Sequence, residues 1–217
     1  MIDAGSPSDI QQFIRSNFPL APVPSVPDIL LHRAGPQSGL WRLAEMDRAF
    51  GTPYWAFSWG GGLALARHIL KFPEIVAGRS VLDLGAGSGI VAIAAAKSGA
   101  QRVLAADTDR YAIAAIALNA AANGVAVAAF AGDLTAGPPP EVHVVLVGDL
   151  FYAQDLAQRV TAFLDRCARS NIAILVGDPW RRFLPRARLT LVAEYSGTDF
   201  GNDDHGKTNA VFAFKAA

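Results

Sequence analysis

The chain has 217 residues, of which 52% are apolar and 18% are charged. This length suits one full domain with a modest extension, and the apolar fraction excludes disorder as the global state. No uninterrupted apolar stretch reaches the roughly 18–20 residues that cross a bilayer, so we expect no membrane partner. The chain does not open on a basic segment followed by an apolar core, so we expect no secretory signal.

Charge and cysteine content narrow the setting further. Nineteen basic residues balance nineteen acidic residues, so the total gives no reason to expect a nucleic-acid partner. Cys167 is the only cysteine, which excludes an internal disulfide and favours the cytoplasm. The histidines are scattered, without a pair at metal-ligand spacing, so we expect no metal site. We also expect a monomer.

Residues 1–50 differ from the rest of the chain, and we expect them to form an extension that caps the substrate side. A short helix is predicted over residues 8–18, and the closely spaced prolines of residues 19–27 force an extended path. The apolar residues 29–31 and 40–41 are interpreted as short edge strands.

Strands and helices alternate through residues 51–217, which we expect to form the main domain. Helices are predicted over residues 61–72, 88–98, 111–122 and 155–170. Strands are predicted over residues 80–84, 102–106, 125–130, 142–147, 172–177, 189–195 and 209–214. The alternation implies a parallel sheet, and the last two strands imply a hairpin. The sequence therefore predicts a doubly wound, seven-stranded, mostly parallel α/β sheet with an antiparallel C-terminal hairpin.

The strongest local motif is Val-Leu-Asp-Leu-Gly-Ala-Gly-Ser-Gly over residues 81–89, where a strand turns into a helix. Gly85, Gly87 and Gly89 permit positive φ and close approach of a ligand to the backbone. Their spacing lacks the Gly-x-x-Gly ending of the dinucleotide fingerprint. Asp83 would repel a pyrophosphate but attract the ammonium of a methionine moiety, directly or through water. The motif therefore favours S-adenosyl-L-methionine (SAM) over a nicotinamide cofactor.

Acidic residues end the next two strands. Asp107 can accept both ribose hydroxyls, whereas Asp109 suits a helix N-cap. Asp133 can accept the adenine amino group while Leu134 packs on the ring, with a turn aspartate as the other interpretation. This order of features over residues 60–217 resembles the Rossmann-like, seven-β-strand SAM-dependent methyltransferases. The resemblance implies that the three glycines lie under the cofactor, with Asp107 at the ribose and Asp133 at the adenine.

The acceptor side carries Asp149 and Tyr152, which end the fourth strand in Asp-Leu-Phe-Tyr. This sequence lacks the Asn/Asp-Pro-Pro-Tyr/Phe of enzymes that methylate glutamine or base amino groups. It resembles instead the Asp/Glu-x-x-Tyr/Phe of a family with many protein-lysine methyltransferases. Together with residues 27–32, 52–62 and 177–186, it is similar to the lysine methyltransferases that act on the electron-transfer flavoprotein β subunit. The resemblance implies that subunit as the protein partner.

Lysine chemistry is consistent with these residues. A lysine with an ordinary pKa of about 10.4 is neutral in only about one molecule per thousand near neutral pH, a cost of roughly 4 kcal/mol. Asp149 can orient the amine, but its charge also favours the ammonium, so we assign it positioning before proton acceptance. Trp59, Trp55 and Tyr152 can stabilise cationic groups through their π faces. Core packing is the alternative for Trp55 and Phe57.

The leading hypothesis is therefore a SAM-dependent protein-lysine N-methyltransferase acting on the electron-transfer flavoprotein β subunit. A methyltransferase for another protein, such as a ribosomal protein, or for a small amine is the first alternative. A non-catalytic SAM-binding module and a nicotinamide-dependent oxidoreductase are alternatives from other classes.

Overall fold

A seven-stranded sheet with the strand order β5-β4-β3-β6-β7-β9-β8 forms the centre of the structure. The computed structural model describes residues 7–47, 50–197 and 208–216. The strands are β3 (Ser80–Leu84), β4 (Arg102–Asp107), β5 (Ala128–Ala131), β6 (Val144–Gly148), β7 (Ala173–Asp178), β8 (Leu189–Ser196) and β9 (Thr208–Phe214). Strands β3 to β7 are parallel, whereas β9 pairs antiparallel with both β7 and β8. The predicted sheet and its antiparallel C-terminal pair are confirmed.

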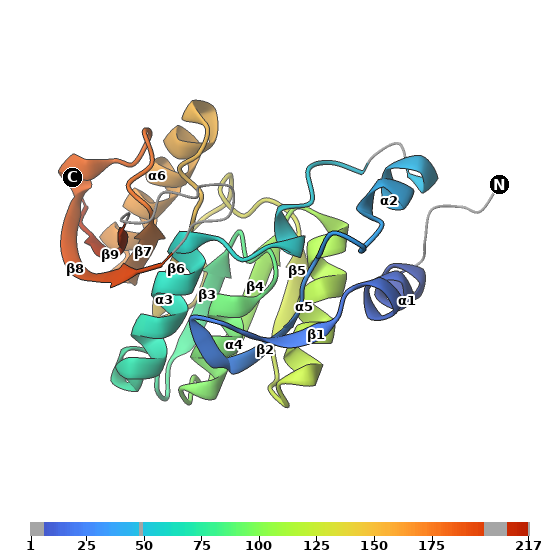
Figure 1. Ribbon diagram of the computed structural model, residues 1–217. Helices are drawn as coiled ribbons and strands as arrows, with labels where there is room; N and C mark the ends of the chain where they lie inside the picture. The colour runs from blue at the N-terminus through green and yellow to red at the C-terminus, as the bar shows by residue number, and fades with distance from the viewer. Residues whose placement is uncertain (1–6, 48–49, 198–207, 217) are drawn as a thin grey trace.

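Helices cover both faces of this sheet. They are α3 (Gly60–Lys71), α4 (Ile90–Lys97), α5 (Arg110–Ala122) and α6 (Gln154–Arg169), with short 3-10 helices at Tyr54–Ala56, Pro73–Ile75 and Arg186–Arg188. Figure 1 shows α3, α4 and α5 on one face and α6 on the other. Successive side chains of a strand point to opposite faces of the sheet, so alternate residues pack in the apolar cores on the two faces. Val81 packs with α3 and α4, whereas Leu82 and Leu84 pack with α6.

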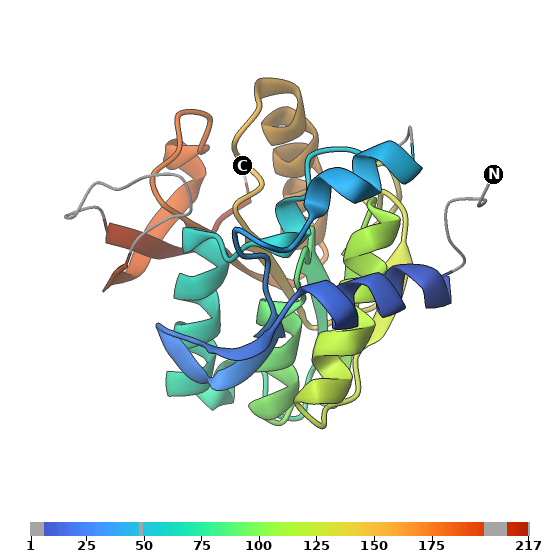
Figure 2. The same ribbon diagram turned by 45° about the vertical axis from the view of Figure 1, so that its right-hand side comes forward.

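The N-terminal extension lies over the face that carries α3, α4 and α5 (Figure 2). It consists of α1 (Pro7–Asn17), β1 (Leu20–Val23), β2 (Val26–His32) and α2 (Leu40–Met46). The predicted first helix is confirmed, but the predicted edge strands are wrong. Residues 29–31 belong to a separate β1–β2 hairpin, and residues 40–41 begin a helix. The helix forms because Leu40 and Leu43, three residues apart, pack on the same apolar cluster.

Two asparagines, Asn119 on α5 and Asn123 directly after it, hold this extension against the main domain. Asn123 accepts a hydrogen bond from the backbone N–H of Leu30 at 3.0 Å and donates to the Leu30 carbonyl at 2.6 Å. Asn119 is fully buried and accepts from the N–H of His32 at 2.8 Å. Its Nδ2 donates at 2.8 Å to the carbonyl of Ser88, in the turn after β3. The extension, α5 and this turn are therefore coupled through one side chain.

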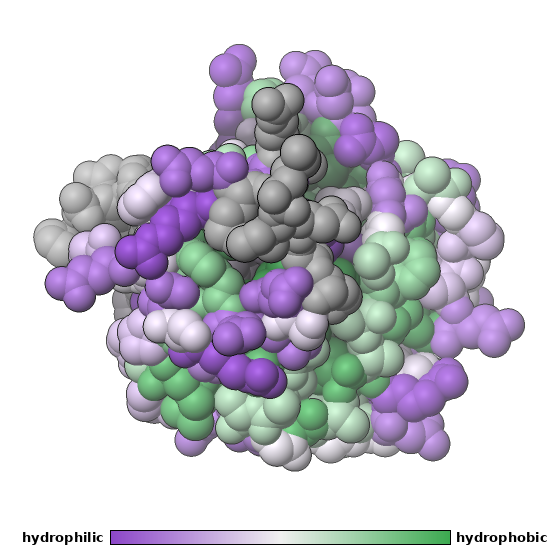
Figure 3. Space-filling view, turned by 90° about the vertical axis from the view of Figure 1, so that its right-hand side faces the viewer, coloured by the Kyte–Doolittle hydropathy of each residue, from purple (hydrophilic) through white to green (hydrophobic). Residues whose placement is uncertain are grey.

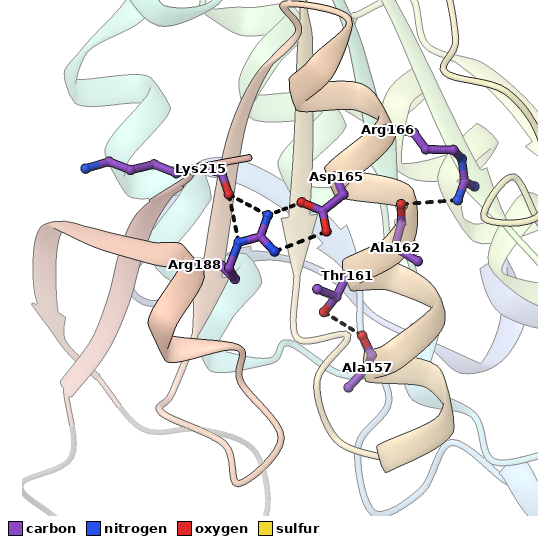
Figure 4. Close-up of polar contacts among 7 residues, drawn as sticks. All are labelled: Ala157, Thr161, Ala162, Asp165, Arg166, Arg188 and Lys215. Carbon is purple, nitrogen blue, oxygen red and sulfur yellow. Dashed lines mark hydrogen bonds and ion pairs between the residues drawn. The ribbon is translucent and has the colours of Figure 1, made fainter. Parts of the chain in front are cut away.

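The C-terminal strands are tied to α6 by an arginine. The guanidinium of Arg188 forms an ion pair with Asp165 of α6 and donates to the Lys215 carbonyl at 2.9 and 3.1 Å (Figure 4). In the same view, Arg166 donates to the carbonyl of Ala162 at 3.1 Å. The Asp165–Arg188 pair belongs to the scaffold, because neither residue is among those that line the main cavity.

Strand β5 forms one edge of the sheet, and all four of its residues are exposed. Figure 3 faces the side of the molecule where β5 and α5 lie and shows hydrophobic surface interspersed with hydrophilic residues. The strand begins at Ala128, three residues later than predicted. The cause is the end of α5, where Gly124 has φ +65° and the N–H of Val125 bonds to the Ala120 carbonyl.

Among the described residues, no helix has the length and apolar character that crossing a bilayer requires.

Candidate active site

The glycine-rich segment after β3 forms a tight turn that ends at the start of α4. Gly85, Gly87 and Gly89 have φ values of +68°, +52° and +80°, in the left-handed region that favours glycine. The backbone N–H groups of Gly85 and Ala86 donate to the carbonyl of Ala106 at the end of β4. A Cβ on Gly85 would lie 2.5 Å from a Leu150 methyl carbon. The turn is therefore fixed against the neighbouring strands without side chains of its own.

A cavity of about 790 Å³ opens beyond the carboxyl ends of β3, β4 and β6. This is where open α/β sheets bind ligands, and the volume suits a small-molecule cofactor. Eight of the ten predicted site residues line it, so the structure brings them into one site: Trp59, Gly85, Gly87, Asp107, Asp133, Leu134, Asp149 and Tyr152. Asp83 and Gly89 are not among the lining residues. A Cβ on Gly89 would face Ile116 at 3.2 Å instead.

Asp83 lies beneath the glycine turn and is 1% exposed. Its carboxylate accepts a hydrogen bond from the N–H of Ala92, in the first turn of α4, at 3.0 Å. Burial raises the pKa of Asp83 to about 7, the Ala92 N–H opposes this rise, and the charge of Asp107 adds to it. The structure therefore gives Asp83 a place beneath the turn that does not line the cavity.

Asp107 does reach the cavity, and its two oxygens are held by backbone donors. Oδ2 accepts from the N–H of Gly87 at 2.8 Å, and Oδ1 accepts from the N–H of Asp109 at 2.9 Å. Burial raises the pKa of Asp107, and these N–H donors oppose the rise. Asp109 accepts from the N–H of Tyr111 at 2.8 Å, which confirms its predicted role as the N-cap of α5.

Asp133 and Leu134 follow β5 at the same end of the sheet. Asp133 is exposed, and its Oδ1 accepts from the hydroxyl and the N–H of Thr135 at 2.6 and 2.8 Å. The Thr135 hydroxyl and then its N–H lower the pKa of this carboxyl. The turn interpretation is therefore confirmed by these bonds, and Asp133 still lines the cavity. Leu134 is half-buried against the α6 core.

Asp149 lines the same cavity and directly follows the carboxyl end of β6. It is a non-glycine residue with φ +59°. Oδ2 accepts from the N–H of Gly62, in the first turn of α3, at 2.7 Å, and Oδ1 forms an ion pair with Arg181 at 3.0 Å. The positive end of the α3 dipole also favours its negative charge.

Close approach of α3 to the sheet makes this contact possible. A Cβ on Gly61 would lie 2.2 Å from the carbonyl oxygen of Gly177 and 2.8 Å from Oδ2 of Asp149. A Cβ on Gly177 would in turn lie 2.1 Å from the carbonyl oxygen of Gly61. The start of α3 can therefore rest on the ends of β6 and β7 only because both positions lack a side chain.

Aromatic rings line the cavity near the Asp149–Arg181 pair. The ring of Tyr54 lies 5.6 Å from that of Trp59 and 5.4 Å from that of Tyr152, between centroids. Trp55 is 1% exposed and stacks against Phe18 at 5.5 Å, so its packing alternative is confirmed even though it also borders the cavity. Burial raises the pKa of Tyr152, so this phenol is neutral near pH 7.

Two of the lining residues that were not predicted as site residues lie beside Asp149 and Tyr152. Tyr54 and Arg181 fall within the segments 52–62 and 177–186 that carry the family resemblance, which was the available signal. No local pattern indicates that Arg181 would pair with Asp149, because 32 positions separate them. Each lies at the end of its own strand, and those strands are neighbours in the sheet.

The donor and acceptor set fits SAM. The glycine turn presents backbone with no side chain, and a Cβ on Gly87 would meet only a Trp55 backbone atom, at 3.7 Å. Asp107 and Asp133 supply carboxylate acceptors for hydroxyl and amino groups. The rings of Trp59 and Tyr152 supply π faces for a cationic sulfur.

Comparisons with known proteins agree with this geometry. The family model for ribosomal protein L11 methyltransferase (PrmA) matches residues 68–169. The electron transfer flavoprotein beta subunit lysine methyltransferase of Danio rerio is 39% identical over 82% of this chain and 70% of its own length. The protein of that name in Xenopus laevis is 36% identical over 94% of this chain and 87% of its own length.

A solved structure shows the same fold. The ribosomal protein L11 methylase of Lactobacillus delbrueckii subsp. bulgaricus superposes with a TM-score of 0.52 at 23% identity, over 70% of this chain and 77% of its own. The relatives found by sequence similarity show the family as well as the fold. The chain belongs to the electron transfer flavoprotein beta subunit lysine methyltransferase family, and it is a SAM-dependent methyltransferase.

Proposed function

We propose that this protein methylates a lysine side chain of the electron-transfer flavoprotein β subunit. One observation carries the proposal: the same cavity is lined by the glycine turn with Asp107, which we name the cofactor end, and by Asp149 with nearby aromatic rings, which we name the acceptor end. Relatives named for that substrate, at 36% to 39% identity, support the choice of acceptor.

We assign the cofactor end as follows. Gly85 and Gly87 lie under SAM, Asp107 accepts from the ribose hydroxyls, and Asp133 accepts from the adenine amino group while Leu134 packs on the ring. Support comes from their common cavity and from the backbone donors that hold Asp107 in place. When bound, SAM supplies a methyl group on a positively charged sulfur, which an amine lone pair can attack. Gly89 and Asp83 support the turn from behind the cavity.

The acceptor end positions the amine. A lysine must first lose its proton to solvent, at the cost of roughly 4 kcal/mol near neutral pH. Asp149 then accepts a hydrogen bond from the neutral amine, whose lone pair is directed at the methyl group. Tyr152 and Trp59 line the channel for the lysine stem and exclude water. Support comes from the fixed orientation of the Asp149 carboxylate between Gly62 and Arg181.

The ribosomal protein L11 methyltransferases suggest a second protein substrate. The enzyme of that name from Geobacter metallireducens is 41% identical, but over only 45% of this chain. The family match over residues 68–169 also omits the segments 52–62 and 177–186. Those segments contribute Tyr54, Trp59 and Arg181 to the acceptor end. The β subunit is therefore the favoured acceptor.

We further propose that the extension of residues 1–50 frames the surface that the protein substrate meets. Asp47, which ends α2, accepts from the Tyr111 hydroxyl at 2.8 Å and from Arg110 at 2.5 Å, and both partners line the cavity. Trp41 on α2 is 61% exposed. Trp41→Ala should raise KM for the protein substrate several-fold and leave SAM affinity unchanged. An unchanged KM would contradict this role.

A monomer in the cytoplasm remains the expected setting, and the buried, unpaired thiol of Cys167 supports a reducing compartment. Size-exclusion chromatography with light scattering and cell fractionation test these two expectations. A dimer, or enrichment in an organelle or the periplasm, would contradict them.

Transfer of radiolabel from SAM to purified acceptors tests the proposed function. The acceptors are the electron-transfer flavoprotein, ribosomal protein L11 and free lysine, each at the same concentration. We expect label on the β subunit. Label on L11 or on lysine alone would keep the methyltransferase and replace its substrate, whereas no transfer to any acceptor would favour a non-catalytic SAM-binding module.

A further inference from the structure

We propose that Arg181 is a positioning residue whose charge lets the acceptor lysine sit beside Asp149 as a neutral amine. The proposal rests on the proposed function, since it concerns an amine acceptor. Arg181 comes from the loop after β7, and its Nη2 lies 3.0 Å from Oδ1 of Asp149. Its guanidinium carbon lies 5.8 Å from the centre of the Trp59 ring, and the residue lines the cavity.

The backbone of this loop holds Arg181 in place. Its N–H donates to Oδ1 of the fully buried Asp178 at 2.6 Å. The preceding residue, Trp180, has φ +66° and packs edge-on against Phe212 at 4.8 Å. A non-glycine residue keeps such a backbone only where the surroundings enforce it. The guanidinium therefore reaches the cavity from a backbone segment that is fixed by Asp178 and by the packing of Trp180.

The pairing solves an electrostatic conflict at the acceptor end. A carboxylate beside a lysine favours the ammonium form and so opposes attack on the methyl group. With Arg181 at 3.0 Å the pair has no net charge, and an ammonium placed there would also meet the guanidinium. Each carboxylate oxygen has a second lone pair, so Asp149 can still accept a hydrogen bond from a neutral amine. Asp149 can thus orient the amine without selecting its protonated form.

Among the described residues, the other titratable groups near the pair do not replace this charge. Asp178 holds the backbone of Arg181, and the two phenols of Tyr54 and Tyr152 line the cavity nearby. Asp107 and Arg159 also line the cavity. The charge of Asp107 raises the pKa of the Tyr152 phenol, and the charge of Arg159 lowers it. Within the described residues that line the cavity, Arg181 is the cation paired with the acceptor-side carboxylate.

The pH dependence of kcat, at saturating SAM and saturating electron-transfer flavoprotein, tests this role, because kcat reports ionisations in the bound complex. Arg181→Gln should raise the apparent pKa of the acceptor by about one unit. The variant should therefore lose about tenfold in kcat between about pH 7 and pH 9, and the loss should shrink to about threefold at about pH 11, because an acceptor with an ordinary pKa of about 10.4 is mostly neutral there. Arg181→Lys keeps a positive charge and should leave the apparent pKa within about 0.3 units of the parent protein, even if kcat falls. SAM affinity should stay within a few-fold in both variants.

Arg182→Gln is the matched control. Arg182 is exposed, stacks on Phe183 and does not line the cavity, so its removal subtracts the same charge one residue away. Its pH profile should match that of the parent protein. A loss in Arg181→Gln that does not shrink between about pH 9 and pH 11 would overturn the electrostatic role. If that variant does not fold, a shift of a full unit in Arg181→Lys would overturn it. No transfer by the parent protein would instead overturn the proposed function.

Discussion

The residues at the two ends of the cavity are fixed in place in different ways. At the cofactor end, backbone N–H groups fix the turn and Asp107, and the glycines contribute no side chains. At the acceptor end, the carboxylate of Asp149 is fixed by Arg181 and by the start of α3, which come from distant parts of the chain. A cofactor shared by many enzymes can thus be held by a local motif, whereas the acceptor needs a tertiary arrangement of side chains.

The largest effect should come from Asp149→Ala. The variant removes the group that orients the amine, so we expect kcat to fall at least about 100-fold. SAM affinity should stay within a few-fold, because the turn and Asp107 are untouched. Steady-state kinetics and calorimetric SAM titration measure the two quantities. Near-normal turnover would show that the acceptor end does not depend on this carboxylate.

Asp165→Ala is the control for that variant. It breaks a different arginine–aspartate pair, Asp165–Arg188, which joins α6 to the C-terminal strands (Figure 4). Because both side chains are only about one-fifth exposed, the free energy of unfolding should fall by about 2 kcal/mol, between the costs for exposed and for buried pairs. Methyl transfer should be unchanged.

Asp107→Asn sharpens the comparison at the cofactor end. The substitution keeps one oxygen acceptor but replaces the other with an amide that clashes with an N–H donor, either Gly87 or Asp109. We expect the Kd for SAM to rise about tenfold, with a smaller effect on kcat once SAM saturates. A normal Kd with a large loss of kcat would reverse the assignment of the two ends.

The smallest effect concerns Asp83 and its dependence on pH. The folded-state pKa is raised to about 7, so the folded protein binds more protons than the unfolded chain between about pH 4 and pH 7. The contribution of Asp83 to stability therefore falls as pH rises through that window. Asp83→Asn keeps an acceptor for the Ala92 N–H without the charge. Its stability relative to the parent protein should increase by roughly 1–2 kcal/mol between pH 6 and pH 8.

Thermal denaturation of both proteins across that range measures the difference. Asp107 and Asp109 also have raised pKa values, but they are present in both proteins, so the difference isolates Asp83. A difference that does not change with pH would mean that Asp83 is charged in the fold at all these values.

The cofactor end could be predicted because its signals are local. The glycine turn occupies nine consecutive residues, and Asp107 ends the strand that follows. The position of Asp83 follows from the period of a strand: it shares the face of Val81, which packs under α4, and this places it behind the turn.

The rest depended on contacts between distant segments. The Asp149–Arg181 pair forms because β6 and β7 are neighbours in the sheet. The position of α3 depends on the close approach of Gly61 to Gly177. The extension was assigned edge strands because short apolar runs do not distinguish a strand from a helix. Leu40 and Leu43 form a helix because α5 and its neighbours supply an apolar cluster for that face.

The most direct test of the central claim is mass spectrometry of the electron-transfer flavoprotein after incubation with SAM and either the parent protein or Asp149→Ala. We expect methyl groups on a lysine of the β subunit with the parent protein and almost none with the variant. Equal methylation by both proteins, or methyl groups on another type of side chain, would contradict it.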